Sequence, residues 1–173
     1  MSSLDKNLEL LLSANEIESR VKGLGFEISE RFKHTSPLLI GVLNGSFIFL
    51  ADLIRSISID CELDFIKVNS YENNKSSGDV NLVLDNSQSV NGKDVILVED
   101  IIDTGLTINF IRNKLMQDSP KSLTIASFLL KKGTNNLDFP IDFIGFEIPH
   151  KFVVGYGLDF NGKKRNLDSL YHI

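Results

Sequence analysis

The chain has 173 residues, of which 42% are hydrophobic and 24% are charged, and its formal net charge is -5 at pH 7. This length and balance are typical of one folded domain with a sizeable core, and the negative charge argues against a general nucleic-acid-binding surface. The only cysteine, Cys61, excludes an internal disulfide and a zinc site built from cysteines. The sequence has no signal-like N-terminus and no apolar run of membrane-spanning length, so we expect a cytoplasmic protein without membrane contact.

The first predicted element is an amphipathic helix. Ser13 and Glu16 fit a capping box, and apolar residues recur at helical spacing across residues 17–32. Gly23 and Gly25 weaken this helix and indicate a bend or close packing. We attach no function to this segment.

A second unit begins with the apolar run Leu38–Leu43, which predicts a buried strand, and continues through Asn44-Gly45 into a helix that starts near Phe47. In open α/β sheets, ligands bind at the carboxyl ends of the strands, so Asn44-Gly45 is a candidate binding turn. Taken alone, an Asn-Gly pair suits an ordinary tight turn better.

Residues 62–68 predict a further strand, and residues 80–84 predict a strand that pairs back with it. The connection between them, residues 69–78, is polar, rich in turn-forming residues and long. Both a mobile lid over a site and a plain hairpin tip are compatible with this composition.

The most informative stretch lies past the middle of the chain. An apolar run, Val95–Val98, predicts a strand buried on both faces, and Glu99 and Asp100 follow it at once. Residues 103–107 then form a turn that opens an apolar-periodic helix. Unpaired amides at a helix start, with Gly105 allowing close approach, can hold a phosphate. The competing interpretations are an ordinary strand with a capped helix and a receiver domain, although a receiver's acidic pair follows its first strand.

The remaining chain adds two strand signals, residues 123–130, which are followed by Lys131, and residues 143–148. Residues 153–159 come next, with two glycines that free the backbone for an unusual path. Strand-end lysines are mostly solvated, and the tail from Phe160 carries no distinct motif. The alternation of strands and helices predicts a parallel α/β sheet.

The stretch V-I-L-V-E-D-I-I-D-T-G-L-T, residues 95–107, closely resembles the phosphoribosyl-pyrophosphate-binding motif of the type I phosphoribosyltransferases. Further stretches from about Leu38 to Arg165 resemble the hypoxanthine-guanine branch, most specifically G-F-E-I-P-H-K-F-V-V-G-Y-G-L-D. The resemblance implies an α/β fold of the type I phosphoribosyltransferase kind over residues 1–173, with a central parallel sheet flanked by helices and a small hood.

The resemblance also implies an activity. Such an enzyme would transfer the phosphoribosyl group from phosphoribosyl pyrophosphate to hypoxanthine or guanine in purine salvage, with Mg2+ as cofactor. Xanthine remains open as a third base. The family's habit of assembly makes a homodimer or homotetramer the expected state.

By the same resemblance, particular residues have particular roles. Asp103 would be the general base, and Ser70 and Tyr71 would belong to a lid. The metal would be held by Glu99, Asp100 and Asp159. The purine site would comprise Lys131, Phe152, Val153 and Asp159. The residues implied for phosphoribosyl pyrophosphate are Leu43, Asn44, Gly45, Glu99, Asp100, Asp103, Thr104, Gly105, Leu106, Thr107 and Arg165.

Two departures from the family pattern matter. Asn44 stands where many relatives have lysine, and Leu106 stands where some have lysine; the Leu43-Asn44 peptide is left open as trans or cis.

Two alternatives are a regulator on the same fold that binds nucleotide and nucleic acid, and a pyrimidine or adenine enzyme. The joint presence of Asp103, Lys131 and Phe152 favours the 6-oxopurine enzyme.

Overall fold

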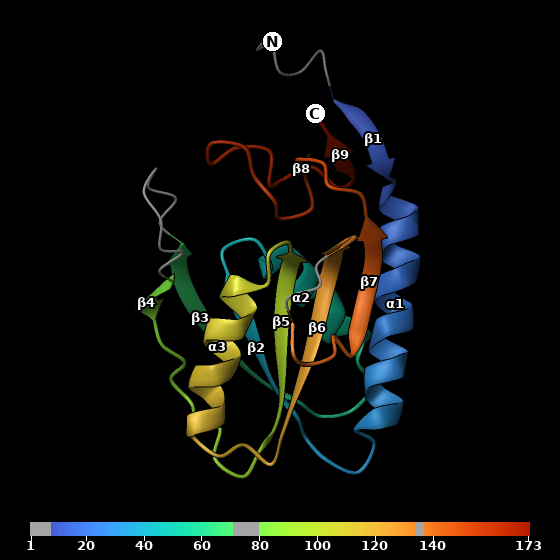
Figure 1. Ribbon diagram of the computed structural model, residues 1–173. Helices are drawn as coiled ribbons and strands as arrows, with labels where there is room; N and C mark the ends of the chain where they lie inside the picture. Colours follow the sequence, from blue (N-terminus) through green and yellow to red (C-terminus); the bar gives the residue numbers. More distant parts are fainter. Residues whose placement is uncertain (1–7, 71–79, 134–136) are drawn as a thin grey trace.

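The computed structural model describes residues 8–70, 80–133 and 137–173. Its centre is a sheet with the strand order β4-β3-β2-β5-β6-β7, in which β4 is antiparallel to β3 and the other neighbours are parallel (Figure 1). The strands are β2 (Leu38–Leu43), β3 (Glu62–Ser70), β4 (Val80–Leu84), β5 (Asp94–Ile102), β6 (Ser122–Lys131) and β7 (Phe143–Ile148). The predicted central parallel sheet is therefore confirmed.

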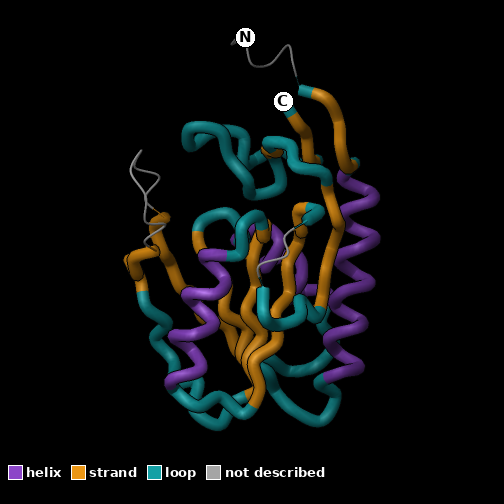
Figure 2. The backbone as a smooth tube through the Cα atoms, in the orientation of Figure 1, coloured by secondary structure: helices purple, strands orange, loops and turns teal. Residues whose placement is uncertain are grey.

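Three helices cover the two faces of this sheet. Helices α1 (Ala14–Arg31) and α2 (Phe47–Ser56) pack on one face, and α3 (Leu106–Gln117) packs on the other (Figure 2). Each interface holds its own apolar cluster, because β2, β5 and β6 present buried side chains alternately to the two faces. The carboxyl ends of the parallel strands stay uncovered by these helices.

A second, smaller sheet lies above those strand ends and forms the predicted hood (Figure 1). It pairs β1 (Glu9–Leu12), β9 (Leu170–His172) and β8 (Val153–Val154), all antiparallel. Both ends of the described chain therefore contribute to the hood. The tail after Phe160, which has no recognisable motif, supplies the middle strand.

The capping box of α1 is confirmed, since the Ser13 hydroxyl accepts from the Glu16 amide and the Glu16 side chain accepts from the Ser13 amide. Helix α1 continues without a break through Gly23 and Gly25, and only Gly25 marks close packing. A Cβ on Gly25 would lie 2.5 Å from the carbonyl oxygen of Ser56 in α2, whereas a Cβ on Gly23 would meet only an ordinary contact at 3.5 Å. Gly25 thus lets α1 approach α2.

Among the described residues, none of the helices combines the length and the hydropathy that crossing a bilayer requires.

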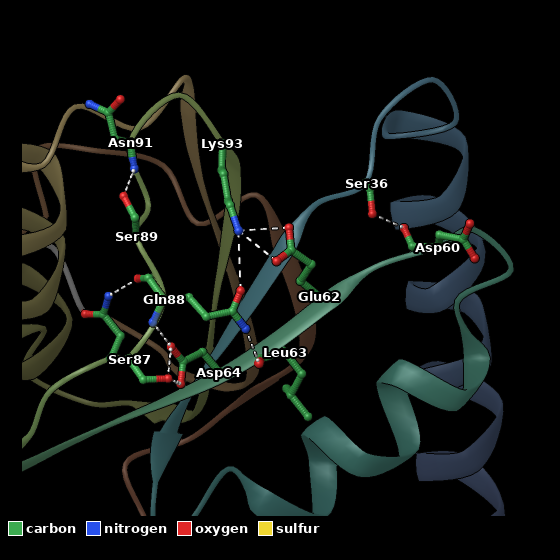
Figure 3. A network of polar contacts seen from close by, with 11 residues as sticks. Ser36, Asp60, Glu62, Leu63, Asp64, Ser87, Gln88, Ser89, Asn91 and Lys93 are labelled. Atoms are coloured by element: carbon green, nitrogen blue, oxygen red, sulfur yellow. Dashed lines mark hydrogen bonds and ion pairs between the residues drawn. The ribbon is translucent and has the colours of Figure 1, made fainter.

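A polar network fastens the β4–β5 connection to β3 (Figure 3). The buried Asp64 carboxylate accepts from the Gln88 amide at 2.7 Å, from the Phe65 amide at 2.8 Å and from the Ser87 hydroxyl at 3.2 Å. Beside it, Lys93 pairs with Glu62 at 2.7 Å. Burial opposes ionisation of Asp64, but these hydrogen bonds outweigh it and lower the pKa of Asp64.

Replacing Asp64 by alanine is expected to lower the free energy of unfolding by about 2–3 kcal/mol at neutral pH, because buried donors lose a charged acceptor. The folded-state pKa is below the unfolded one, so this contribution is present above the ordinary pKa of 3.8 and is lost as the pH falls through the folded value. Urea unfolding at neutral pH and in acid measures both effects. The exposed Asp60→Ala serves as control, and an equal loss in both variants would contradict the assignment.

Candidate active site

A cavity of about 550 Å3 opens at the carboxyl ends of β2, β3 and β5, beneath the hood. Its lining combines two strand-end turns, three carboxylates and two cations, so it is suited to a charged, hydroxyl-bearing ligand. The lining residues are Val42, Leu43, Asn44, Gly45, Lys67, Val68, Asn69, Glu99, Asp100, Thr107, Asp159 and Arg165.

The turn after β2 forms one wall of the cavity. The peptide bond between Leu43 and Asn44 is cis. The buried Ser46 hydroxyl donates to the carbonyl of Val42 at 2.6 Å and holds the turn against the strand. A Cβ on Gly45 would lie 1.5 Å from Oδ2 of Asp100, so only glycine lets this turn reach the acidic pair.

The acidic pair at the end of β5 forms the floor. Glu99 is 6% exposed, and its Oε2 has no hydrogen-bond partner among the described residues. Burial, followed by the neighbouring Asp100 charge, raises the pKa of Glu99 well above its ordinary value. Burial also raises the pKa of Asp100, although hydrogen bonds and the Arg165 guanidinium oppose the shift. A bound cation would offset the cost of charging the buried Glu99 and the half-buried Asp100 side by side.

Helix α3 begins beside this floor. Gly105 is its N-cap with a φ of 82°, and no side chain caps the first turn in the usual way. The Leu106 amide makes only a long contact of 3.4 Å to the Thr104 hydroxyl, while Thr107 faces the cavity. The sequence pattern predicts that the first-turn amides bind an anion, and the N-cap residue makes no side-chain hydrogen bond that would compete for them. The Leu106 side chain is 52% exposed and does not line the cavity.

The hood closes the cavity with Asp159 and Arg165. Arg165 pairs with Asp159 at 2.6 Å and donates to the carbonyl of Gly157 at 2.7 Å. The second Asp159 oxygen accepts from the Gly162 amide at 2.6 Å. Gly157, at a φ of 98°, also lies against the Gly45 carbonyl, where a Cβ would be at 2.2 Å. The hood and the β2 turn therefore form a continuous wall.

A second cluster lies outside the cavity lining, at the ends of β5 and β6. The Lys131 ammonium donates to Oδ2 of Asp103 at 2.6 Å, and Nδ1 of His150 lies 3.7 Å from the other Asp103 oxygen. The Lys131 side chain is only 15% exposed, against 47% for Asp103. The structure thus brings the predicted base and the predicted purine-reading lysine together.

Two other predicted purine residues, Phe152 and Val153, belong to the hood segment. Phe152 is 53% exposed and meets Phe160 edge-on at 5.7 Å between ring centroids. Val153 is buried in β8, paired with His172. Of the predicted lid residues, Ser70 ends β3, and Tyr71 lies outside the described residues.

Lys67, Val68 and Asn69 line the cavity although sequence reasoning had not selected them. They follow one another at the end of β3, where the signal was available: β3 is a strand of the same parallel sheet, so its carboxyl end meets the same edge as the ends of β2 and β5.

The predicted metal ligands do not form a complete protein-only site. Within residues 8–70, 80–133 and 137–173, no group of three or more His, Cys, Asp or Glu side chains is placed to hold a metal ion. Asp159 is paired with Arg165 at 2.6 Å. A cation here would need oxygen atoms from a ligand as well.

Fold and cavity together define the class of the protein as an α/β enzyme with the type I phosphoribosyltransferase fold. Residues 8–161 match the family described as the phosphoribosyl transferase domain. The chain is 44% identical over 170 residues to the hypoxanthine-guanine phosphoribosyltransferase of Aquifex aeolicus, covering 97% of this chain and 96% of that protein.

Two further relatives agree. The hypoxanthine-guanine phosphoribosyltransferase of Bacillus subtilis is 44% identical over 160 residues, covering 92% of this chain and 89% of that protein. The crystal structure of such an enzyme from Bacillus anthracis superposes with a TM-score of 0.90 at 39% identity, covering 95% of this chain and 98% of that one. The chain therefore belongs to the phosphoribosyltransferase family, in its hypoxanthine(-guanine) branch.

Proposed function

We propose that the protein transfers the phosphoribosyl group of phosphoribosyl pyrophosphate to hypoxanthine or guanine, releasing pyrophosphate in a reaction of purine salvage. One observation carries the choice of base: the ion pair of Asp103 and Lys131, 2.6 Å apart, at the strand ends beside the acidic cavity. A carboxylate and an ammonium side by side match a purine edge that presents a ring N–H next to an oxo group. The family relationship supports the same choice.

In this proposal the cavity binds phosphoribosyl pyrophosphate. The 5-phosphate lies on the amides of the α3 N-terminus, from Thr104 to Thr107, because unpaired helix-start amides favour an anion. Glu99 and Asp100 accept from the ribose hydroxyls. The pyrophosphate lies along the Leu43–Gly45 turn, with Arg165 from the hood as a charged donor.

Magnesium is part of the proposal. Oε2 of Glu99 has no hydrogen-bond partner among the described residues, and a bound cation would satisfy it and offset the raised pKa values of Glu99 and Asp100. The donors are all oxygens, and magnesium in enzymes is commonly held by one or two carboxylates together with substrate phosphates. Asp159 also lines the cavity and is proposed to hold the metal on the side of the pyrophosphate. Bound magnesium would neutralise part of the negative charge on the departing pyrophosphate.

The purine is proposed to lie between Lys131 and the hood. Asp103 takes the proton from the attacking ring nitrogen. An ammonium has three N–H donors, so Lys131 can keep its bond to Asp103 and also donate to the 6-oxo group. Phe152, at 53% exposure, has a face free to stack on the base, and the Val153 backbone would read the opposite edge. Ser70 and Tyr71 are proposed to begin a lid that excludes water.

Product formation from phosphoribosyl pyrophosphate and Mg2+ with four bases tests the proposal. Hypoxanthine and guanine should react, with xanthine deciding the breadth of the site, and adenine should be slower by roughly 10^3-fold or more in kcat/KM because its amino group leaves Lys131 unpaired. If phosphoribosyl pyrophosphate bound but no base reacted, the proposed activity would be wrong, and a ligand-sensing regulator would become the leading hypothesis.

A cytoplasmic location and assembly as a homodimer or homotetramer complete the proposal. Both rest on the family relationship. Light scattering of the purified protein distinguishes the dimer from the tetramer and from a monomer.

Gly45→Ala is expected to lower kcat/KM for phosphoribosyl pyrophosphate by roughly 10^2-fold, since its Cβ would displace either the turn or the Asp100 carboxylate, 1.5 Å away. The matched control is Gly23→Ala in α1, where the added methyl makes an ordinary contact. That variant should keep full activity and gain about 0.5–1 kcal/mol of stability. Steady-state kinetics and urea unfolding of both variants decide; unchanged kinetics in Gly45→Ala would mean that the turn does not touch the ligand.

A further inference from the structure

Lys67 occupies a distinctive position in the cavity. It is the β3 residue that pairs with Leu43 in parallel register, so it stands beside the first residue of the β2 turn. Its side chain is half-buried and lines the cavity together with Asn44 and Arg165.

No ion pair or hydrogen bond joins the Lys67 ammonium to any described residue. Six of the other described lysines hold a carboxylate within 4.0 Å, namely Lys22, Lys33, Lys93, Lys114, Lys121 and Lys131. A half-buried ammonium that lines a cavity and has no acceptor among the described residues is satisfied by solvent or by an anionic ligand.

The charges that line the cavity indicate which of its cations is placed to bind an anionic ligand along the β2 turn. The other cation of the lining, Arg165, is already engaged by the Asp159 carboxylate and the Gly157 carbonyl. The β2 turn brings no charge of its own, because Asn44 is neutral. Among the described lining residues, Lys67 is therefore the cation whose ammonium is not shared with a protein acceptor.

We propose that Lys67 binds the pyrophosphate group of phosphoribosyl pyrophosphate and supplies the side-chain charge that the Asn44 turn lacks. The proposal rests on the proposed function and adds a substrate-binding residue to it. The ammonium donates to a pyrophosphate oxygen, a charge-assisted hydrogen bond formed in the substrate complex and in the pyrophosphate product complex alike. Because the contact lies on the pyrophosphate side, it should leave purine binding unaffected.

The test compares Lys67→Met with Lys67→Arg and with Lys67→Met combined with Asn44→Lys. Three constants are measured for each variant. They are the KM for phosphoribosyl pyrophosphate, the KM for hypoxanthine, and the Kd of magnesium pyrophosphate by calorimetry. We expect Lys67→Met to raise the KM for phosphoribosyl pyrophosphate and the pyrophosphate Kd by roughly 10- to 100-fold, with the hypoxanthine KM changed less than about twofold. Lys67→Arg should keep most of the affinity, and Asn44→Lys should restore part of it.

Lys33→Met is the matched control. It removes the same charge near the end of α1, where Lys33 has only a 4.0 Å contact to Glu30, and it should leave every constant unchanged. Parallel loss of purine and pyrophosphate affinity with lower thermal stability, or a loss that neither Lys67→Arg nor Asn44→Lys repairs, would overturn the proposal. So would an unchanged pyrophosphate Kd. The calorimetric titration needs no turnover, so a wild-type protein that transfers to no base would refute the proposed function while still reporting on Lys67.

Discussion

Asp103→Asn is expected to lower kcat with hypoxanthine by roughly 10^2- to 10^4-fold, the range associated with loss of a general base. The purine ring nitrogen must lose its proton as it attacks the sugar, and an amide cannot accept that proton. Asparagine keeps the size of the side chain and one oxygen that can still accept from the Lys131 ammonium, which lies 2.6 Å from the aspartate. The geometry should therefore survive while the chemistry is lost.

The KM for phosphoribosyl pyrophosphate separates this role from a structural one. Asp103 does not line the cavity, so that KM should change less than about threefold, whereas kcat carries the effect. Asp118→Asn at the end of α3 makes the same change at an exposed site and should be neutral. If Asp103→Asn retained kcat within about twofold, a different residue would have to be the general base. His150, whose Nδ1 lies 3.7 Å from Asp103, would then be the neighbour to examine next.

The central sheet was predictable from the sequence because its signals are local. Leu38–Leu43 and Val95–Val98 are short apolar runs bounded by turn residues, and such runs have few alternatives to a buried strand. The acidic pair and the start of α3 follow directly along the chain, so their shared location at the sheet edge needs no long-range information.

The hood was predictable from the family resemblance alone. Its middle strand, Leu170–His172, is three residues long and pairs with Glu9–Leu12 from the other end of the chain. Neither segment has an alternation long enough to indicate a strand, and pairing across such a separation leaves no local trace. The closure of the cavity by Arg165 depends on this long-range contact.

Lys67 was missed for a different reason. Residues 62–68 predict a strand, and a single lysine within a strand belongs to no motif that marks it as a ligand-binding residue. Its place in the cavity depends on the pairing of β3 with β2 in a register that sets Lys67 opposite Leu43. Strand order and register are set by tertiary structure. The same is true of the Asp103–Lys131 pair, because Asp103 directly follows β5 and Lys131 ends β6.

Lys131→Gln is expected to reduce the preference for hypoxanthine over adenine by roughly 10^2- to 10^4-fold in kcat/KM. The lysine ammonium offers only donors, which suits the 6-oxo group of hypoxanthine and leaves the amino group of adenine facing another donor. A glutamine amide presents either a donor or an acceptor and removes that conflict. Most of the change should come from a slower reaction with hypoxanthine, because the charged hydrogen bond is lost.

The adjacent Lys132→Gln is the matched control, since Lys132 is exposed and its described contact is a backbone bond from its amide to the carbonyl of Ile148. It should leave the base preference unchanged. Lys131 also orients the Asp103 carboxylate, so Lys131→Gln should slow all bases somewhat, and the ratio between bases is the informative quantity. A uniform loss with an unchanged ratio would assign Lys131 to positioning Asp103 alone, and base recognition would then depend on the hood, where Phe152 and Val153 lie.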